Sequence, residues 1–228
     1  MTRRPFNVAV FASGGGTNFQ ALLDHQATQD QWRVALLVMN REAGAAQRAK
    51  DAGVPVRIIA TRDRDVAEVG TETLTALAEF EIDAVLLAGY LRRIPSQVIE
   101  RFSGRILNIH PALLPDFGGK GMYGMHVHRA VAESDVNETG ATVHFVTEAY
   151  DDGAILGQWR VARLPGDTPE DIAARVLQVE HRLYPAAVDH LCAALAEGRA
   201  PDRMKDLWLD EPPEVLRTPT PERPEEDQ

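Results

Sequence analysis

Two polar residues interrupt an apolar stretch in the middle of the chain. Asn108 and His110 lie two positions apart in the sequence Ile-Leu-Asn-Ile-His, and in a β-strand such positions face the same side. Polar groups on a buried strand need hydrogen-bond partners or a chemical role. An amide donor and an imidazolium that converge on one point can stabilise an oxyanion, as acyl transfer requires. A hydrogen-bonded structural pair is the alternative interpretation.

A carboxylate at Asp151 could complete such a site. Asp151 opens the sequence Asp-Asp-Gly between two strand-like stretches. A carboxylate beside His110 would orient the imidazole and raise its pKa, which favours the protonated form near neutral pH. Asp-Asp-Gly is also a good turn sequence, so a purely structural role for Asp151 stays open at this point.

A glycine-rich loop, Ser-Gly-Gly-Gly-Thr-Asn at residues 13–18, lies between a strand pattern and a helix pattern. Glycines let backbone N–H groups approach an anion closely, and a helix N-terminus adds partial positive charge. The loop lacks the Lys-Ser/Thr of a nucleoside triphosphate loop, and Phe19 stands where Gly-x-Gly-x-x-Gly needs its last glycine. The loop therefore suits a single phosphate, and a tight turn with a helix cap is the alternative.

Four further histidines raise the question of a metal site. They are His126, His128, His144 and His181. The spacing His126-x-His128 could contribute two ligands, but the glycine-rich stretch at 118–124 before it is flexible, and no Glu-x-x-His or Cys partner accompanies it. We therefore expect no metal.

The elements that must position these residues alternate between strand and helix patterns. Short, continuously apolar strands separated by helices predict an α/β fold with a doubly wound, mostly parallel sheet and helices on both faces. The glycine loop and the end of the fifth strand would then meet at the carboxyl edge of the sheet, where ligands bind. The expected strands cover residues 8–11, 34–38, 56–59, 84–88 and 106–109, and the expected helices cover 18–29, 43–52, 65–79 and 95–102.

The alternation of strand and helix patterns ends after residue 140. Strand patterns at 141–146 and 155–161 are separated by a loop rather than a helix, so we expect an antiparallel edge from these C-terminal strands. A long helix at 169–187 follows, with Thr168 as its N-cap. We expect one domain over residues 1–210 and a disordered, acidic, proline-rich tail over residues 211–228.

Composition limits the location and the partners. No apolar run reaches the roughly 18 to 20 residues of a membrane span, and no secretory signal is expected. Cys192 is the only cysteine, which excludes an internal disulfide and fits a reducing, cytoplasmic location. The net charge of −10 argues against a nucleic acid as the main partner.

Six segments resemble, in order, the glycinamide ribonucleotide formyltransferases of purine synthesis, a family of folate-dependent formyltransferases. The segments are residues 13–18, 87–92, 107–115, 140–146, 151–153 and 178–181, within a resemblance that covers about residues 6–210. It implies transfer of a formyl group from the co-substrate 10-formyltetrahydrofolate to the amine of glycinamide ribonucleotide, by a monomer or homodimer. Two departures are Gly15, where the family often has Asn, and the long stretch at 118–124.

The resemblance also implies roles for individual residues. The catalytic set would be Asn108, His110 and Asp151. The ribonucleotide would be bound by Gly16, Thr17, Asn18 and Glu180. The folate would contact Arg64, Leu91, Arg92, Arg93, Ile94 and Asn108.

Three other functions share part of this pattern. A methionyl-tRNA formyltransferase shares the Asn-Ile-His-Pro segment but needs a basic face for tRNA and carries an extra C-terminal domain. A formyltetrahydrofolate hydrolase shares the catalytic set but usually carries an N-terminal regulatory domain. A non-catalytic phosphosugar-binding module would need the glycine loop alone. The acidic charge and the glycine loop favour transfer to glycinamide ribonucleotide.

Overall fold

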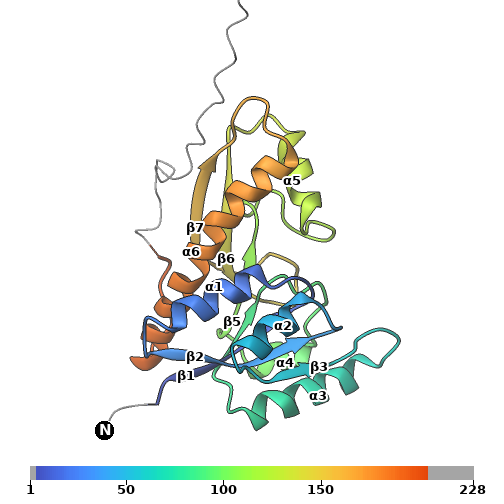
Figure 1. Ribbon diagram of the computed structural model, residues 1–228, viewed down its shortest axis with the longest axis vertical. Coiled ribbons are helices and arrows are strands. Elements are labelled where there is room, and N and C mark those ends of the chain that lie inside the picture. The colour runs from blue at the N-terminus through green and yellow to red at the C-terminus, as the bar shows by residue number, and fades with distance from the viewer. Residues whose placement is uncertain (1–3, 205–228) are drawn as a thin grey trace, which may run out of the picture.

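A seven-stranded sheet with the order β3-β2-β1-β4-β5-β6-β7 forms the centre of the protein (Figure 1). The computed structural model describes residues 4–204. The strands are β1 (Phe6–Ala12), β2 (Trp32–Met39), β3 (Val56–Ile58), β4 (Ala84–Leu87), β5 (Ile106–His110), β6 (Glu138–Phe145) and β7 (Ile155–Ala162). The helices are α1 (Thr17–Gln26), α2 (Gly44–Asp51), α3 (Val66–Glu79), α4 (Ser96–Arg101), α5 (Met125–Ala132) and α6 (Pro169–Ala196).

The strand pairing confirms the predicted α/β fold with an antiparallel edge. Strands β1 to β5 pair in parallel, whereas β6 runs antiparallel to both β5 and β7. Strand β1 lies between β2 and β4, so the chain winds outward from β1 in both directions. The carboxyl ends of β1 and β4 therefore form the switch point at which ligands bind in open α/β sheets.

The apolar strands are buried because helices cover both faces of the sheet. Along β1, Val8 and Val10 face the core that contains α1, α2 and α6 residues, whereas Ala9 and Phe11 face the core of α3 and α4. This alternation explains why the strand sequences are continuously apolar. In the described part of the chain, no helix is long and apolar enough to cross a membrane.

Two helices differ from the sequence prediction. Helix α5 was not predicted, because His and Val have low helix propensity. The helix is stabilised because Val127 and Val131 are buried. It lies beside α6 (Figure 1). Helix α6 was predicted to end near Ala187 but continues to Ala196. Its buried face extends through Leu191, so packing carries the helix past the internal proline.

The start of α6 forms as predicted. The Thr168 side chain accepts a hydrogen bond from the Asp171 N–H at 3.1 Å, and the Asp171 carboxylate accepts one from the Thr168 N–H at 2.9 Å. This capping box fixes the register of the helix that carries the expected substrate residue Glu180. The single domain over residues 1–210 remains a prediction, and the predicted tail at 211–228 lies outside the described residues.

Candidate active site

Four polar side chains converge at the carboxyl end of β5. Asn108 and His110 project from β5, and His144 projects from β6 directly opposite Asn108 in the antiparallel register. Asp151 reaches the cluster from the loop between β6 and β7. The structure therefore brings together the three residues predicted as catalytic and adds a fourth.

Asp151 lies between two imidazoles. Its Oδ2 is 3.7 Å from Nδ1 of His110, and its Oδ1 is 3.5 Å from Nε2 of His144. The His144 Nε2 atom is also 3.0 Å from the amide nitrogen of Asn108. These distances place an amide, two imidazoles and a carboxylate around one point, which is the arrangement needed for proton transfer next to a developing negative charge.

The backbone at Asp151 is held in an unusual conformation. Its φ of 54° lies in the left-handed region, which Asp adopts more readily than most residues. The backbone N–H of Gly119 donates to Oδ2 of Asp151 at 2.8 Å. Asp-Asp-Gly therefore forms the turn that its sequence predicted, and this turn also directs the Asp151 carboxylate toward His110 and His144.

The electrostatics of His110 correct the sequence prediction. Burial lowers the pKa of His110 and outweighs the nearby Asp151 charge, which acts to raise it. From the sequence we predicted that the Asp151 carboxylate would raise the pKa of His110. That prediction was wrong because the side chain is almost fully buried and the carboxylate is 3.7 Å away, beyond hydrogen-bond distance. The lowered pKa favours a neutral imidazole at neutral pH.

The tautomer of neutral His110 follows from its other contact. Its Nε2 lies 2.9 Å from the carbonyl oxygen of Phe117. A carbonyl only accepts, so Nε2 carries the proton and Nδ1 is the free base facing Asp151. His110 is thus oriented to take up a proton next to a carboxylate that can stabilise the resulting imidazolium.

Asp151 is the charged member of the cluster. Burial acts to raise its pKa, but a hydrogen bond with His144, the attraction that His110 exerts when it is protonated and the Gly119 N–H together outweigh it. The net result is a pKa below the ordinary aspartate value. Asp151 is therefore ionised at neutral pH.

His144 was not predicted as a site residue. Its Nδ1 lies 2.9 Å from the carbonyl oxygen of Phe145 and donates to it, which turns Nε2 toward Asn108 and Asp151. In the sequence, His144 stood out only as one of four histidines that could bind a metal and as part of a segment with family resemblance. Its role depends on the β5–β6 register, which local patterns do not specify.

The two histidines of α5 occupy different environments. His128 is buried, and its pKa is lowered to about 4. Burial is the larger cause, and repulsion by the protonated form of His110 is the smaller one. Its Nδ1 has no hydrogen-bond partner among the described residues. The ring of His126 lies against Tyr123 with 5.2 Å between centroids. Within residues 4–204, no group of three or more His, Cys, Asp or Glu side chains is placed to hold a metal ion.

The glycine loop occupies the switch point at the end of β1. Gly16 is the N-cap of α1 with a φ of 73°, and no side chain caps the helix. A Cβ atom at this position would lie 2.7 Å from Cβ of Ala45 in α2. Position 16 therefore requires glycine both for its conformation and for the close approach of α2.

Two residues predicted to bind the ribonucleotide meet beside this loop. The amide of Asn18 donates to Oε2 of Glu180 at 2.5 Å, although the residues are 162 positions apart. Burial raises the pKa of Glu180 to about 7, and the hydrogen bond from Asn18 opposes that rise. The Oδ1 atom of Asn18 has no partner among the described residues. Glu180 therefore changes charge near neutral pH.

We expect Glu180→Gln to stabilise the protein at about pH 8 but not at about pH 5. The folded pKa lies above the ordinary glutamate value of 4.5, so the cost of ionising Glu180 is absent below that value and is complete above about pH 7. The shift corresponds to at most about 3 kcal/mol. Urea denaturation at both pH values measures it. Equal stability differences at the two pH values would contradict the assignment.

Ser13 connects the glycine loop to the segment at 91–94. Its hydroxyl donates to Oδ1 of Asn40 at 2.6 Å and accepts from the backbone N–H of Leu91 at 3.0 Å. Ser13 is almost fully buried. The loop predicted to bind phosphate and the segment predicted to bind folate are therefore joined by one side chain at the switch point.

The predicted folate residues lie in two places. Leu91, Arg92 and Arg93 are exposed after β4, and Arg93 donates to the Glu148 carbonyl at 3.2 Å, in the same loop as Asp151. The Ile94 side chain is buried in the core, so a ligand there would meet backbone.

Arg64 lies apart from that segment. It is in the loop between β3 and α3, which projects from one side of the molecule (Figure 1). Its guanidinium binds Glu72 at 2.6 Å and the Ala60 carbonyl at 3.2 Å. The structure therefore gives Arg64 one partner on α3 and one in its own loop, and none within residues 91–94.

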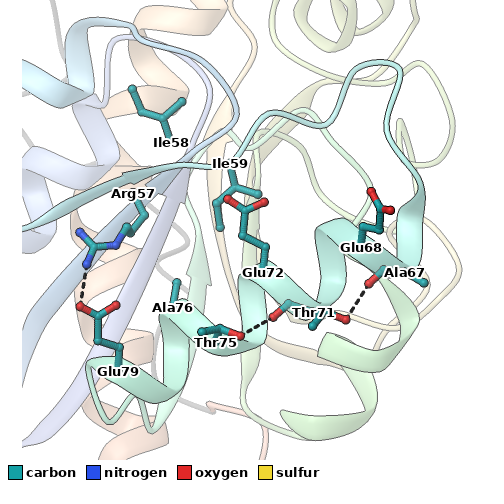
Figure 2. Close-up of a pocket in the computed structure, with 10 residues that line it drawn as sticks. All are labelled: Arg57, Ile58, Ile59, Ala67, Glu68, Thr71, Glu72, Thr75, Ala76 and Glu79. Atoms are coloured by element: carbon teal, nitrogen blue, oxygen red, sulfur yellow. Dashed lines mark hydrogen bonds and ion pairs between the residues drawn. The ribbon is translucent and has the colours of Figure 1, made fainter.

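A cavity of about 670 Å³ lies between β3 and α3 (Figure 2). Arg57 reaches across one end to Glu79, with 2.7 Å between the charged atoms, and Glu68 and Glu72 lie along the helix (Figure 2). None of its lining residues belongs to the cluster around Asp151. A smaller cavity of about 400 Å³ lies beside the glycine loop.

Comparison with known proteins identifies a family. The formyl transferase family model matches residues 6–188. The chain is 46% identical to the chloroplastic phosphoribosylglycinamide formyltransferase of Arabidopsis thaliana, over 81% of this chain and 65% of that protein. It is 33% identical to the phosphoribosylglycinamide formyltransferase of Escherichia coli K12, over 90% of this chain and 93% of that protein. The crystal structure of glycinamide ribonucleotide transformylase 1 from Symbiobacterium toebii has a TM-score of 0.77 and 36% identity, covering 90% of this chain and 92% of that one.

Proposed function

The chain belongs to the formyl transferase family, and we propose that it transfers the formyl group of 10-formyltetrahydrofolate to the amine of glycinamide ribonucleotide in purine synthesis. One observation carries this proposal. The cluster of Asn108, His110 and Asp151 lies at the same carboxyl edge as a glycine loop without a triphosphate signature. The cluster can support transfer of an acyl group, and the glycine loop suits the phosphate of a sugar phosphate.

The reaction begins with attack of the amine nitrogen on the formyl carbon. A new C–N bond forms, and the carbonyl oxygen becomes an oxyanion. The amide of Asn108 has two N–H donors; one faces His144, and the other would donate to the oxyanion. The transfer is direct, with no acyl-enzyme intermediate.

One proton must move from the attacking amine to the leaving nitrogen N10. Nδ1 of neutral His110 would accept it, and the resulting imidazolium would be stabilised by Asp151 and would in turn stabilise the oxyanion. When His110 returns the proton to N10, the C–N10 bond breaks and tetrahydrofolate leaves. Asp151 orients the imidazole and remains ionised throughout.

The substrates would approach this cluster from two sides. Backbone N–H groups at Gly16 and Thr17, with the side chain of Asn18, would bind the phosphate, and Glu180 would bind another part of the ribonucleotide. The folate would lie along residues 91–94 and the Asp151 loop, with Arg64 as a further contact. We propose a cytoplasmic enzyme, monomeric or homodimeric, with small-molecule substrates and neither nucleic acid nor membrane as partners.

An acceptor comparison tests this function. We expect formyl transfer from 10-formyltetrahydrofolate to glycinamide ribonucleotide, and a rate at least about 100-fold lower with glycinamide riboside, which lacks the phosphate. Methionyl-tRNA should not be formylated, because the chain carries a net charge of −10. Faster formylation of methionyl-tRNA than of the ribonucleotide would contradict the proposal.

A further inference from the structure

The segment at 117–119, between β5 and α5, binds both His110 and Asp151 through its backbone. The carbonyl oxygen of Phe117 accepts a hydrogen bond from Nε2 of His110 at 2.9 Å. The N–H of Gly119 donates to Oδ2 of Asp151 at 2.8 Å, and that same oxygen lies 3.7 Å from Nδ1 of His110. One short stretch of backbone therefore holds the far side of the imidazole and also the carboxylate oxygen that faces its near side.

These two hydrogen bonds favour the charged forms of the pair. Burial lowers the pKa of His110, whereas the Asp151 charge and the Phe117 carbonyl act to raise it. Burial acts to raise the pKa of Asp151. A hydrogen bond with His144, then attraction to protonated His110 and then the Gly119 N–H act to lower it. The segment therefore stabilises an imidazolium beside a carboxylate, which is the pair that forms when His110 takes up the amine proton.

Two other histidines lie close to this pair. Nε2 of His144 on β6 lies 3.5 Å from Oδ1 of Asp151, the oxygen that does not face His110. The charge interaction between His128 on α5 and His110 is weak near neutral pH, because a pKa of about 4 keeps His128 neutral there. Proton uptake by His110 therefore depends on its burial, on Asp151 and His144, and on the backbone at 117–119.

Close packing at Gly118 allows the segment to reach both partners. A Cβ atom at Gly118 would lie 2.6 Å from Cδ2 of Leu114 and 3.3 Å from Cβ of Asp151. The φ of Gly118 is not positive, so the lack of space, rather than the backbone conformation, requires glycine here. Phe117 has a left-handed φ of 54°, which residues with a Cβ rarely adopt, and its side chain packs against the core. The packing of Phe117 and the missing side chain at Gly118 together bring the two backbone groups to the catalytic pair.

We propose that Gly118 is a positioning residue, which keeps His110 in the tautomer with a free Nδ1 and keeps Oδ2 of Asp151 directed at that nitrogen. This inference rests on the proposed function for the reaction that uses the pair. A side chain at position 118 would push the segment away from Asp151. The His110 and Asp151 side chains would then lose the hydrogen bonds that orient them. Neutral His110 would carry its proton on either ring nitrogen, and fewer molecules would present a free base to the amine.

A size series at position 118 tests this role by separating kcat from KM. We expect Gly118→Ala to lower kcat by about tenfold and Gly118→Val by about 100-fold or more. KM for each substrate should change by less than about threefold, because the substitution displaces the reacting pair rather than the glycine loop or residues 91–94. Gly118→Ala, the smaller change, decides the test if Gly118→Val does not fold.

Gly121→Ala is the matched control. It adds the same methyl group three positions along the same stretch, where a Cβ would meet no atom of residues 4–204 within 4 Å. Its φ of 93° makes Ala less favourable there than at Gly118, so the control also measures the effect of strain in the loop. Gly121→Ala should keep kcat within about threefold of wild type. Equal losses of kcat in Gly118→Ala and Gly121→Ala, or wild-type kcat in Gly118→Val, would overturn the proposal.

Nitrogen-15 NMR of the imidazoles tests the same role without turnover. At about pH 8, where His110 is neutral, we expect the wild-type protein and Gly121→Ala to carry the His110 proton on Nε2. Gly118→Ala should show both neutral tautomers, and the signal missing from His110→Ala assigns the residue. A pure Nε2 tautomer in Gly118→Ala would overturn the proposal, even if kcat falls.

The two readouts also separate this inference from the proposed function. If the wild-type protein transfers no formyl group but the His110 tautomer changes as expected, the proposed function fails and the orientation of the pair by Gly118 stands. If the wild-type protein transfers the formyl group but the tautomer is unchanged in Gly118→Ala, the positioning role alone is rejected.

Discussion

Replacing His110 with Ala or Asp151 with Asn should each reduce kcat for formyl transfer by about 100-fold or more while the protein remains folded. His110→Ala removes the base that takes up the amine proton at Nδ1. Asp151→Asn removes the charge 3.7 Å from that nitrogen, so the imidazolium formed during the reaction loses its stabilising partner. Steady-state rates with both substrates saturating measure the effect.

Asp152→Asn provides the matched control for the charge change. Asp152 is the next residue in the same loop, but it is exposed and forms no ion pair with His110 or His144. It should keep kcat within about threefold of wild type. Near-normal kcat in His110→Ala or Asp151→Asn, with a melting temperature close to wild type, would refute the catalytic assignment.

Gly16→Val should raise KM for glycinamide ribonucleotide by roughly 100-fold, far more than KM for the folate. A side chain at position 16 must adopt a φ of 73° and would place Cβ 2.7 Å from Cβ of Ala45 and 3.0 Å from its Cα. Because Ala45 is in α2, the loop or the helix must shift, and the N–H groups at Thr17 and Asn18 would move with it. Paired saturation curves, each with the other substrate in excess, measure the two constants.

Two companion variants sharpen this test. A Cβ at Gly15 would meet no atom within 4 Å, so Gly15→Ala should leave both constants nearly unchanged. Asn18→Ala removes one donor and should raise KM for the ribonucleotide less than Gly16→Val does. If Gly16→Val raises both constants equally in a folded protein, the loop is a structural turn and the phosphate binds elsewhere.

Local patterns were sufficient for the sheet and for part of the site. Continuous apolar strands predicted a parallel sheet covered on both faces, because burial on two faces removes the alternation of polar residues. The period of two predicted that Asn108 and His110 share a side of β5, since that relation depends only on strand geometry. The switch point then placed the glycine loop at the same edge.

Features that depend on distant contacts were not predictable in the same way. His144 belongs to the site because β5 and β6 pair in one register, which joins residues 36 positions apart. The direction of the His110 pKa depends on a balance between burial and a distance of 3.7 Å, and no local pattern contains either quantity.

Transfer of a labelled formyl group tests the central claim most directly. The wild-type protein is incubated with 10-formyltetrahydrofolate labelled in the formyl carbon, with and without glycinamide ribonucleotide. We predict that label appears in formylglycinamide ribonucleotide in a one-to-one ratio with released tetrahydrofolate, and that without the acceptor neither tetrahydrofolate nor labelled formate forms at a comparable rate. Release of labelled formate at the same rate in the presence and absence of the ribonucleotide would contradict the account, because the cluster around Asp151 would then activate water rather than the amine.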